Sequence, residues 1–232
     1  MPSSRSVTFA TCVAEPTRYE ACRESVQALR HPGLEVALQA VDNASNCFSC
    51  PEALNLAWGH ALTDLVVFCH EDVVFPPEWL ERLLESLSVL EGADPPWAVL
   101  GPMGRSGKQF KGRGSGPDGV EAFHGPLPAL VETLDEMCLV VRRSLSLRFD
   151  ENLGGFHLYG VDLCIQAAEA GLGCYAIDAP CRHASRTLHR PPEYHAIKRK
   201  LQRKWMFRRR KVGRSVGTTC GRIRFGIFEG WF

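Results

Sequence analysis

Apolar and polar positions in the first part of the chain follow the periods of strands and helices. Residues 7–13 and 34–41 are apolar runs of strand length. Between them, Cys22, Val26 and Leu29 fall on one face of a helix. The pattern predicts a right-handed β-α-β unit whose parallel strands end at one edge of a sheet.

A third apolar run, residues 65–69, ends in the polar tripeptide His70-Glu71-Asp72. Its unbroken apolar character predicts a strand buried on both faces, and ligands of open α/β sheets bind beyond the carboxyl ends of such strands. His70 and Asp72 alternate to the same side, so an imidazole and a carboxylate can reach one cation or phosphate together. A strand followed by an ordinary polar turn is the alternative.

The rest of the chain continues the α/β pattern up to one exceptional segment. Further elements are expected as helices over residues 51–63, 79–90 and 163–170 and as strands over residues 97–100, 137–141 and 174–177. Residues 101–125 contain eight glycines in 25 positions, with Arg and Lys among them and little apolar periodicity. They are expected to form either a mobile loop or a lid that orders over a ligand.

The charge of the 232-residue chain is unevenly distributed. Up to Cys181 there are 12 Lys and Arg against 24 Asp and Glu, whereas from Arg182 onward there are 15 against 2. We therefore expect an α/β domain over residues 1–185 and a basic C-terminal extension over residues 186–232.

The basic extension contains Tyr194, Ile197, Leu201 and Trp205 at helical spacing. A basic amphipathic helix of this kind binds an anionic membrane surface, an acidic protein face or nucleic acid. Docking onto the acidic body of the same chain is a further alternative.

No stretch approaches the ~20 apolar residues of a membrane span, and the first six residues lack the apolar core of a signal peptide. A cytoplasmic protein is expected. Most of the ten cysteines stand singly in apolar runs, and the close pair Cys47 and Cys50 lacks the second pair that a structural zinc site needs.

The motifs, in their order and spacing, resemble those of the family 2-like glycosyltransferases of the GT-A fold. The resemblance extends over about residues 7–185 and is strongest to the bacterial branch whose third-strand end is His-Gln-Asp. The matching stretches are Val41-Asp42-Asn43, Ala53-Leu54-Asn55, Val66 to Val73, Glu132 to Asp135, Phe149-Asp150-Glu151, Phe156 to Cys164, and His183.

The resemblance implies a GT-A-like, Rossmann-like, mostly parallel sheet flanked by helices, and a metal site at its rim. Asp72 matches the acidic residue that holds a divalent cation against the nucleotide diphosphate, and His183 matches a histidine that completes this site. His70 stands where most members have an Asp, and it is grouped with the nucleotide ligands. Manganese or magnesium is expected. Zinc held through His70 and His183 is the alternative, with no thiolates expected at the rim to support it.

The resemblance also implies a nucleotide-sugar donor, linked to UDP or GDP. Asp42 matches the acidic residue that contacts the nucleoside, and Ala14 matches the strand-end backbone beneath it. Asn55 and Glu71 are placed with them as nucleotide-binding residues.

Two carboxylates are expected to carry the transfer. Asp162 matches the general base of inverting members, and Asp135 matches a carboxylate beside the sugar and the acceptor. The sequence therefore predicts a cation-dependent glycosyltransferase that acts on a polysaccharide, a lipid-linked or a protein acceptor. Its tail would support the nucleotide phosphates or hold the enzyme at the inner face of an anionic membrane.

Two other functions compete with this one. The first is a non-catalytic module that binds nucleotide sugars. The second is a nucleic-acid-binding protein acting through the basic tail, which would leave the motifs of the body unexplained.

Overall fold

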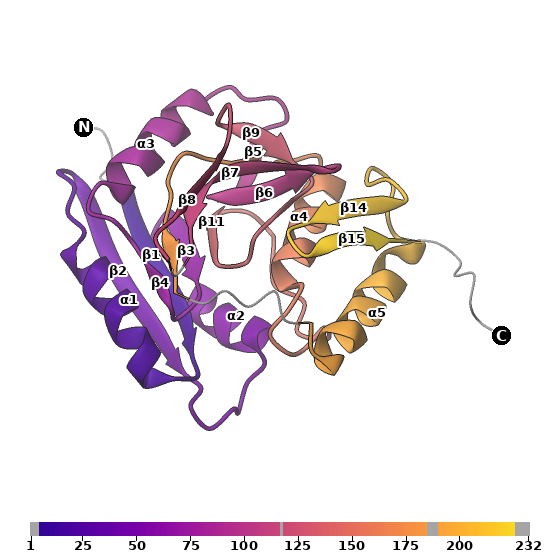
Figure 1. The fold of residues 1–232 in the computed structure, drawn as a ribbon, viewed down its shortest axis with the longest axis horizontal. Helices are drawn as coiled ribbons and strands as arrows, with labels where there is room; N and C mark the ends of the chain where they lie inside the picture. The colour runs from indigo at the N-terminus through magenta and orange to yellow at the C-terminus, as the bar shows by residue number, and fades with distance from the viewer. Residues whose placement is uncertain (1–4, 117, 185–189, 226–232) are drawn as a thin grey trace.

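The computed structural model describes residues 5–116, 118–184 and 190–225 (Figure 1). The first part of the chain forms β1 (Arg5–Val13), α1 (Pro16–Ala28), β2 (Leu34–Asp42), α2 (Cys50–His60), β3 (Leu65–Cys69), β4 (Val73–Val74), α3 (Trp79–Val89) and β5 (Trp97–Gly101). The middle part forms β6 (Met103–Ser106), β7 (Gln109–Ser115), β8 (Glu121–His124), β9 (Ala129–Val131), β10 (Thr133–Leu134) and β11 (Cys138–Arg142). The last part forms α4 (Tyr159–Glu169), β12 (Gly173–Ala176), β13 (Arg182–His183), α5 (Pro192–Met206), β14 (Ser215–Thr218) and β15 (Gly221–Arg224).

The central sheet of the described chain has seven strands in the order β2-β1-β3-β11-β5-β12-β9. β1 is parallel to β2, as the β-α-β pattern predicted. β1 is also parallel to β3, and β12 is parallel to β5. β11, however, is antiparallel to both of its neighbours, and β9 is antiparallel to β12. The sheet is therefore mixed and not mostly parallel. In the described chain no helix lies between β5 and β11, and parallel neighbours are usually joined by a helical crossover.

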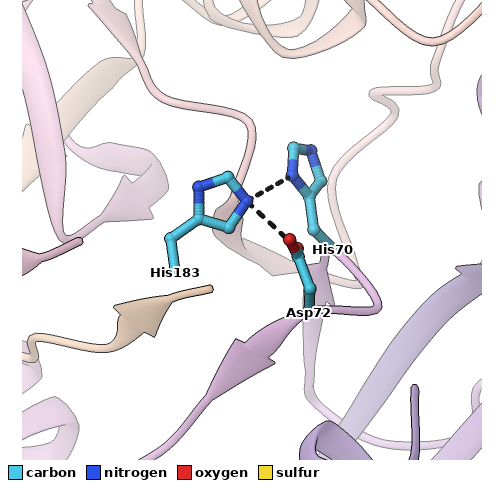
Figure 2. A group of neighbouring side chains, drawn as sticks. All are labelled: His70, Asp72 and His183. Atoms are coloured by element: carbon cyan, nitrogen blue, oxygen red, sulfur yellow. Dashed lines mark hydrogen bonds and ion pairs between the residues drawn. The ribbon is translucent and has the colours of Figure 1, made fainter. Parts of the chain in front are cut away.

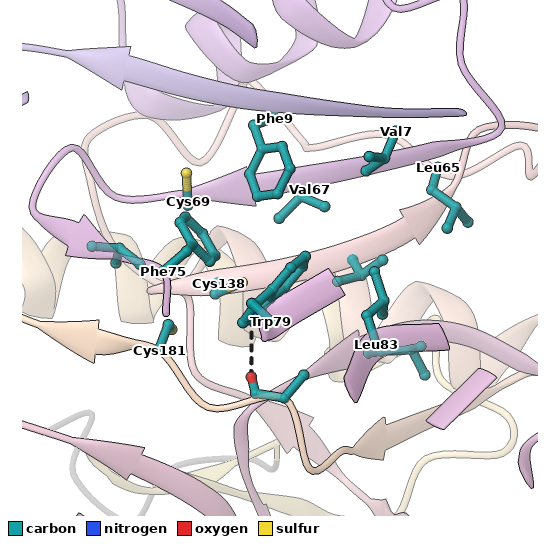
Figure 3. Packing of buried hydrophobic residues seen from close by; sticks show 14 of the residues in the cluster. Val7, Phe9, Leu65, Val67, Cys69, Phe75, Trp79, Leu83, Cys138 and Cys181 are labelled. Carbon is teal, nitrogen blue, oxygen red and sulfur yellow. Dashed lines mark hydrogen bonds between the residues drawn. The ribbon is translucent and has the colours of Figure 1, made fainter. Parts of the chain in front are cut away.

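Helices cover both faces of this sheet, and alternate strand residues point into two separate cores. Phe9 and Val67 pack with residues of α1 and α3, whereas Val66 and Phe68 pack with residues of α2 and α4. This alternation explains why the strands have continuous apolar sequences. In the first core, the ring of Phe75 lies 5.0 Å from that of Phe9 (Figure 3).

The glycine-rich segment forms strands where the sequence predicted a loop or lid. β6, β7 and β8 make a meander within a second sheet of order β10-β6-β7-β13-β4, in which β8 pairs with β7. Glycine is required at Gly112, which has a φ of +132° and where a Cβ atom would lie 2.1 Å from the carbonyl oxygen of Pro102. Arg113 of this segment pairs with Glu121 and Asp178, so its charge is used within the protein.

The basic C-terminal helix α5 packs directly against α4. Ile197, Leu201 and Trp205 of α5 share one buried cluster with Val161 and Ile165 of α4. The domain boundary expected after residue 185 falls in residues 185–189, outside the described residues. Within the described part of the chain, no helix combines the length and the apolar character that crossing a membrane demands.

A buried ionic network fastens α5 to α4. The carboxylate of Asp162 is 0% exposed, and its Oδ2 lies 2.8 Å from Lys204 Nζ, which also lies 2.7 Å from Asp150 Oδ2. Trp205 Nε1 donates to Asp162 Oδ1 at 2.7 Å, and the side-chain amide of Gln166 donates to Oδ2 at 2.7 Å. Three donors therefore replace the water that this carboxylate loses on burial.

Asp162→Asn is expected to lower the free energy of unfolding by about 2–3 kcal/mol, because it removes one partner of a buried ion pair. This decrease should be smaller than the cost of leaving a buried charge without any partner, because Lys204 keeps its ion pair with Asp150. Urea unfolding followed by circular dichroism measures it. Glu35→Gln, an exposed carboxylate on the edge strand β2, is the control. Equal midpoints for both variants would contradict the assignment.

Candidate functional site

Three side chains meet where β3 leaves the central sheet. His70 directly follows β3, Asp72 precedes β4, and His183 lies on β13, which pairs antiparallel with β4. His183 Nε2 lies 3.0 Å from Asp72 Oδ1 and 3.3 Å from His70 Nδ1 (Figure 2). The strand end, the short β4 strand and the distant β13 strand thus build one cluster.

The hydrogen bonds of this cluster fix the tautomer of His70. A carboxylate only accepts, so His183 Nε2 carries the proton that faces Asp72. His70 Nδ1 faces the same proton and is therefore an acceptor, which places the proton of the neutral His70 ring on Nε2. Nε2 donates to the hydroxyl of Tyr159 at 3.0 Å. The lone pair of His70 Nδ1 consequently points toward Asp72 and His183.

The pKa values agree with this assignment. Burial, together with the neighbouring His183, lowers the pKa of His70 to about 4, so its ring is neutral at physiological pH. Burial also acts to lower the pKa of His183, but its hydrogen bond with Asp72 and the charge of that carboxylate outweigh burial and raise the pKa.

The cluster fits a divalent cation. The ligand atoms of His70, Asp72 and His183 all lie within 4.8 Å of one another, and bonds of about 2.0–2.2 Å from each allow one ion to bridge them. Two imidazoles and one carboxylate suit manganese, iron or zinc better than magnesium, which prefers oxygen ligands. His70, expected as a nucleotide ligand, therefore joins the two expected metal ligands.

Two cavities adjoin this cluster. The first has a volume of about 200 Å³ and is lined by Cys12, Ala14, Arg18, Cys50, Cys69, His70, Glu71, Asp72, Phe156, Tyr159 and His183. Thiols that the sequence did not place at the rim thus stand in its wall, although none belongs to the group of three ligands. The second cavity, of about 500 Å³, is lined by His70 and His183 and by segments of β7, β10–β11, the start of α4, and the β14–β15 turn. His70 and His183 therefore stand between two spaces, each large enough for part of a substrate.

The expected nucleotide ligands are only partly brought together. Ala14 and Glu71 line the first cavity, and Glu71 Oε2 accepts the backbone N–H groups of Ala14 at 2.7 Å and of Glu15 at 2.9 Å. Asp42 is exposed at the end of β2, accepts the N–H of Ala44, and is not among the lining residues of the cavities described above. Glu71 thus ties the end of β1 to the end of β3.

Asn55 has a structural position on α2. Its side-chain amide donates to the carbonyl oxygen of Phe149 at 2.8 Å and to Glu151 at 2.9 Å, and its oxygen accepts the N–H of Phe149. It lines neither cavity. These contacts hold the loop that leads to α4.

The two expected catalytic carboxylates lie in different environments. Asp135 lines the second cavity together with His70 and His183, and one of its oxygens accepts the N–H of Met137 at 3.1 Å. Asp162 lies in the buried network with Lys204 and lines neither cavity. The structure thus gives Asp162 a structural position where the sequence placed a general base.

Glu136 and Tyr159 are site residues that the sequence reasoning missed. Glu136 accepts the backbone N–H groups of Leu158 at 3.1 Å and Gly160 at 2.8 Å, so its carboxylate caps the start of α4. Burial raises its pKa to about 8 against the effect of these donors. The position of Glu136 next to Asp135 was the only feature of the sequence that could have pointed to it as a site residue. Tyr159 could not be distinguished from any other buried aromatic residue of an amphipathic helix.

Comparisons with known proteins find sequence similarity to one protein and structural similarity to glycosyltransferases of known fold. No family model matches the chain. It is 33% identical over 174 residues to a protein of Fuscovulum blasticum named ATP synthase subunits region ORF 6, a match that covers 72% of this chain and 68% of that protein.

Solved structures of S. aureus TarS, a GT-A glycosyltransferase, have the same fold. The structure of TarS residues 1–349 matches with a TM-score of 0.55 at 10% identity, and its complex with UDP-GlcNAc with 0.55 at 12%. The match covers 88% of this chain in both cases, and the chain spans only about two thirds of the TarS fragment. The predicted GT-A-like architecture is confirmed at the level of the fold.

Proposed function

We propose that this chain, which belongs to the same family as the protein of Fuscovulum blasticum named ATP synthase subunits region ORF 6, is a glycosyltransferase that uses a nucleotide-diphosphate sugar. The observation that carries the proposal is the position of the cluster of His70, Asp72 and His183. It stands at the carboxyl end of β3 in a GT-A-like fold, with a cavity on each side. We infer that the first cavity receives the nucleotide diphosphate and the second the sugar and its acceptor.

His70, Asp72 and His183 would hold a divalent cation, for which the nitrogen-rich donor set favours manganese over magnesium. A cation bound there neutralises the negative charge that develops on the departing nucleotide diphosphate. The contact of Glu71 with the backbone of Ala14 and Glu15 keeps the wall of the first cavity in place for the nucleotide.

Asp135 is the candidate general base. It lines the second cavity beside His183, so a bound acceptor hydroxyl can approach its carboxylate, whereas Asp162 is enclosed by its own donors. A base must lie within hydrogen-bond reach of the proton that it takes. The acceptor class, whether polysaccharide, lipid-linked or protein, stays a prediction.

Calorimetric titration of UDP and GDP with and without Mn²⁺ tests the donor site. One of them is expected to bind only with the cation. Asp72→Asn, which keeps the size of the side chain, should abolish this cation-dependent binding because the cluster loses its charged ligand. Binding of equal strength by the wild type and Asp72→Asn would rule out this cluster as the metal site.

Tyr159→Phe is expected to weaken Mn²⁺ binding about 10–100-fold, because the hydroxyl that orients His70 and fixes its tautomer is removed. Titration of Mn²⁺ alone measures the affinity, and nitrogen-15 spectra of the His70 ring report the tautomer. Tyr194→Phe is the matched control, since this tyrosine lines the second cavity without a hydrogen bond to His70 among the described contacts. An unchanged Mn²⁺ affinity in Tyr159→Phe would show that its hydroxyl does not position the ligand.

Asp135→Asn is expected to slow release of the nucleoside diphosphate from the bound nucleotide sugar about 10²–10⁴-fold while leaving nucleotide affinity within a few-fold, because only proton transfer is lost. Asp64→Asn, an exposed aspartate just before the opposite end of β3, is the control. If both variants turn over like the wild type, Asp135 is not the base. If the wild type itself binds the nucleotide sugar without turnover, the chain is a binding module.

A further inference from the structure

The helix α5 has one buried face and one cationic face. Its apolar residues Tyr194, Ile197, Leu201 and Trp205 are 7% exposed or less, because they pack against α4 and the β14–β15 hairpin. The amphipathic helix expected from the sequence therefore cannot insert its apolar side into a bilayer. Only the opposite, exposed face is available to a partner. In Figure 1, α5 lies on the side of the molecule opposite α1.

We call the exposed surface of α5 and the segment after it the cationic face. Arg199 and Arg203 are four residues apart and therefore lie on one side of the helix. The face consists of Arg199, Arg203, Phe207, Arg208, Arg210 and Arg214, all of which are exposed.

The positive charges of this face are not neutralised by the described part of the protein. None of its five arginines has a carboxylate within ion-pair distance among the described residues. Lys204, by contrast, pairs with Asp150 and Asp162 and accounts for the docking of the tail on the acidic body. Glu169 accepts the backbone N–H groups of Arg210, Lys211 and Val212, which fixes this segment at the end of α4.

An apolar group stands among these charges. Phe207 directly follows α5, and it is 85% exposed. An aromatic ring in this setting gains free energy by entering the headgroup region of a bilayer, while each neighbouring arginine is attracted to anionic lipids. Single-stranded nucleic acid binds instead to several aromatic rings on which successive bases stack. The other aromatic residues of α5, Tyr194 and Trp205, are buried and cannot serve in this way.

We propose that the cationic face binds the surface of an anionic phospholipid bilayer, with the arginines at the lipid phosphates and Phe207 among the headgroups. The binding is peripheral, since the face offers charge and one ring but no apolar stripe. This inference does not depend on the glycosyltransferase activity. In combination with that proposed function, it favours an acceptor presented at a membrane, because Tyr194 at the start of α5 lines the second cavity.

Co-sedimentation of the full chain with vesicles tests the proposal. We expect binding to equimolar phosphatidylcholine and phosphatidylglycerol, no binding to phosphatidylcholine alone, and release at about 1 M NaCl. Arg199→Gln/Arg203→Gln should lower the partition coefficient about thirty-fold, since two cations leave the face. Phe207→Ser should lower the partition coefficient several-fold at low salt. It should also lower the fraction of protein that stays bound to vesicles at higher salt, because salt does not screen the apolar contribution of the ring.

Arg23→Gln/Arg30→Gln is the matched control, because it removes the same charge from α1 and the residues just after it, and α1 lies on the opposite side of the molecule from α5 in Figure 1. Equal loss of vesicle binding in both double variants would overturn the proposal, as it would show a response to net charge alone. Tighter binding to single-stranded RNA than to anionic vesicles would also overturn it. Nucleotide titration of Arg199→Gln/Arg203→Gln separates the two proposals, since its cation-dependent nucleotide binding should match the wild type.

Discussion

The buried ion pair between Asp162 and Lys204 is the constraint on which the second half of the structure depends. A carboxylate without exposure to water is stable only if donors replace its hydration, and Trp205 and Lys204 of α5 and Gln166 of α4 supply them. Removing α5 would take away two of the three donors to Asp162, leaving only Gln166, and would uncover the apolar surface of α4. The basic end of the chain is therefore an integral part of the fold. It also supplies part of the wall of the second cavity, through Tyr194 and the β14–β15 turn.

The candidate site is likewise determined by the need of buried polar groups for hydrogen-bond partners. Each ring nitrogen of His70 has a hydrogen-bond partner. The Asp72 carboxylate can only accept, and this fixes the direction of the other hydrogen bonds in the cluster. The result is a neutral imidazole whose lone pair faces a carboxylate and a second imidazole. Glu136 holds the start of α4, from which Tyr159 reaches His70. The orientation of His70 in the candidate site thus depends on a helix start fixed by a residue of the neighbouring β10–β11 loop.

The sequence predicted the elements that rest on local patterns. The strands and helices from β1 to α3, apart from the two-residue strand β4, follow from apolar periodicity, and the common side of His70 and Asp72 follows from strand alternation. The glycine-rich segment could not be predicted, because its strands depend on pairing with segments far away in the chain, such as β7 with β13. Tyr159 carries no local signal. The surroundings of Asp162 could not be predicted, because an acidic residue in the first turn of a helix suits a cap, a base or a buried pair, and its partner Lys204 stands 42 positions later.

The distance between the site residues along the chain has a consequence for how the protein acquires its function. His183 is separated from His70 by 113 positions, and it reaches the cluster through β13, a two-residue strand that pairs with β4 and with β7. Such a contact closes one of the longest loops of the fold and carries a large entropy loss, so it forms after the local β-α-β units. During synthesis, the ribosome must therefore release most of the chain before three ligands can meet. A nascent or partly folded molecule therefore lacks the complete cluster of His70, Asp72 and His183.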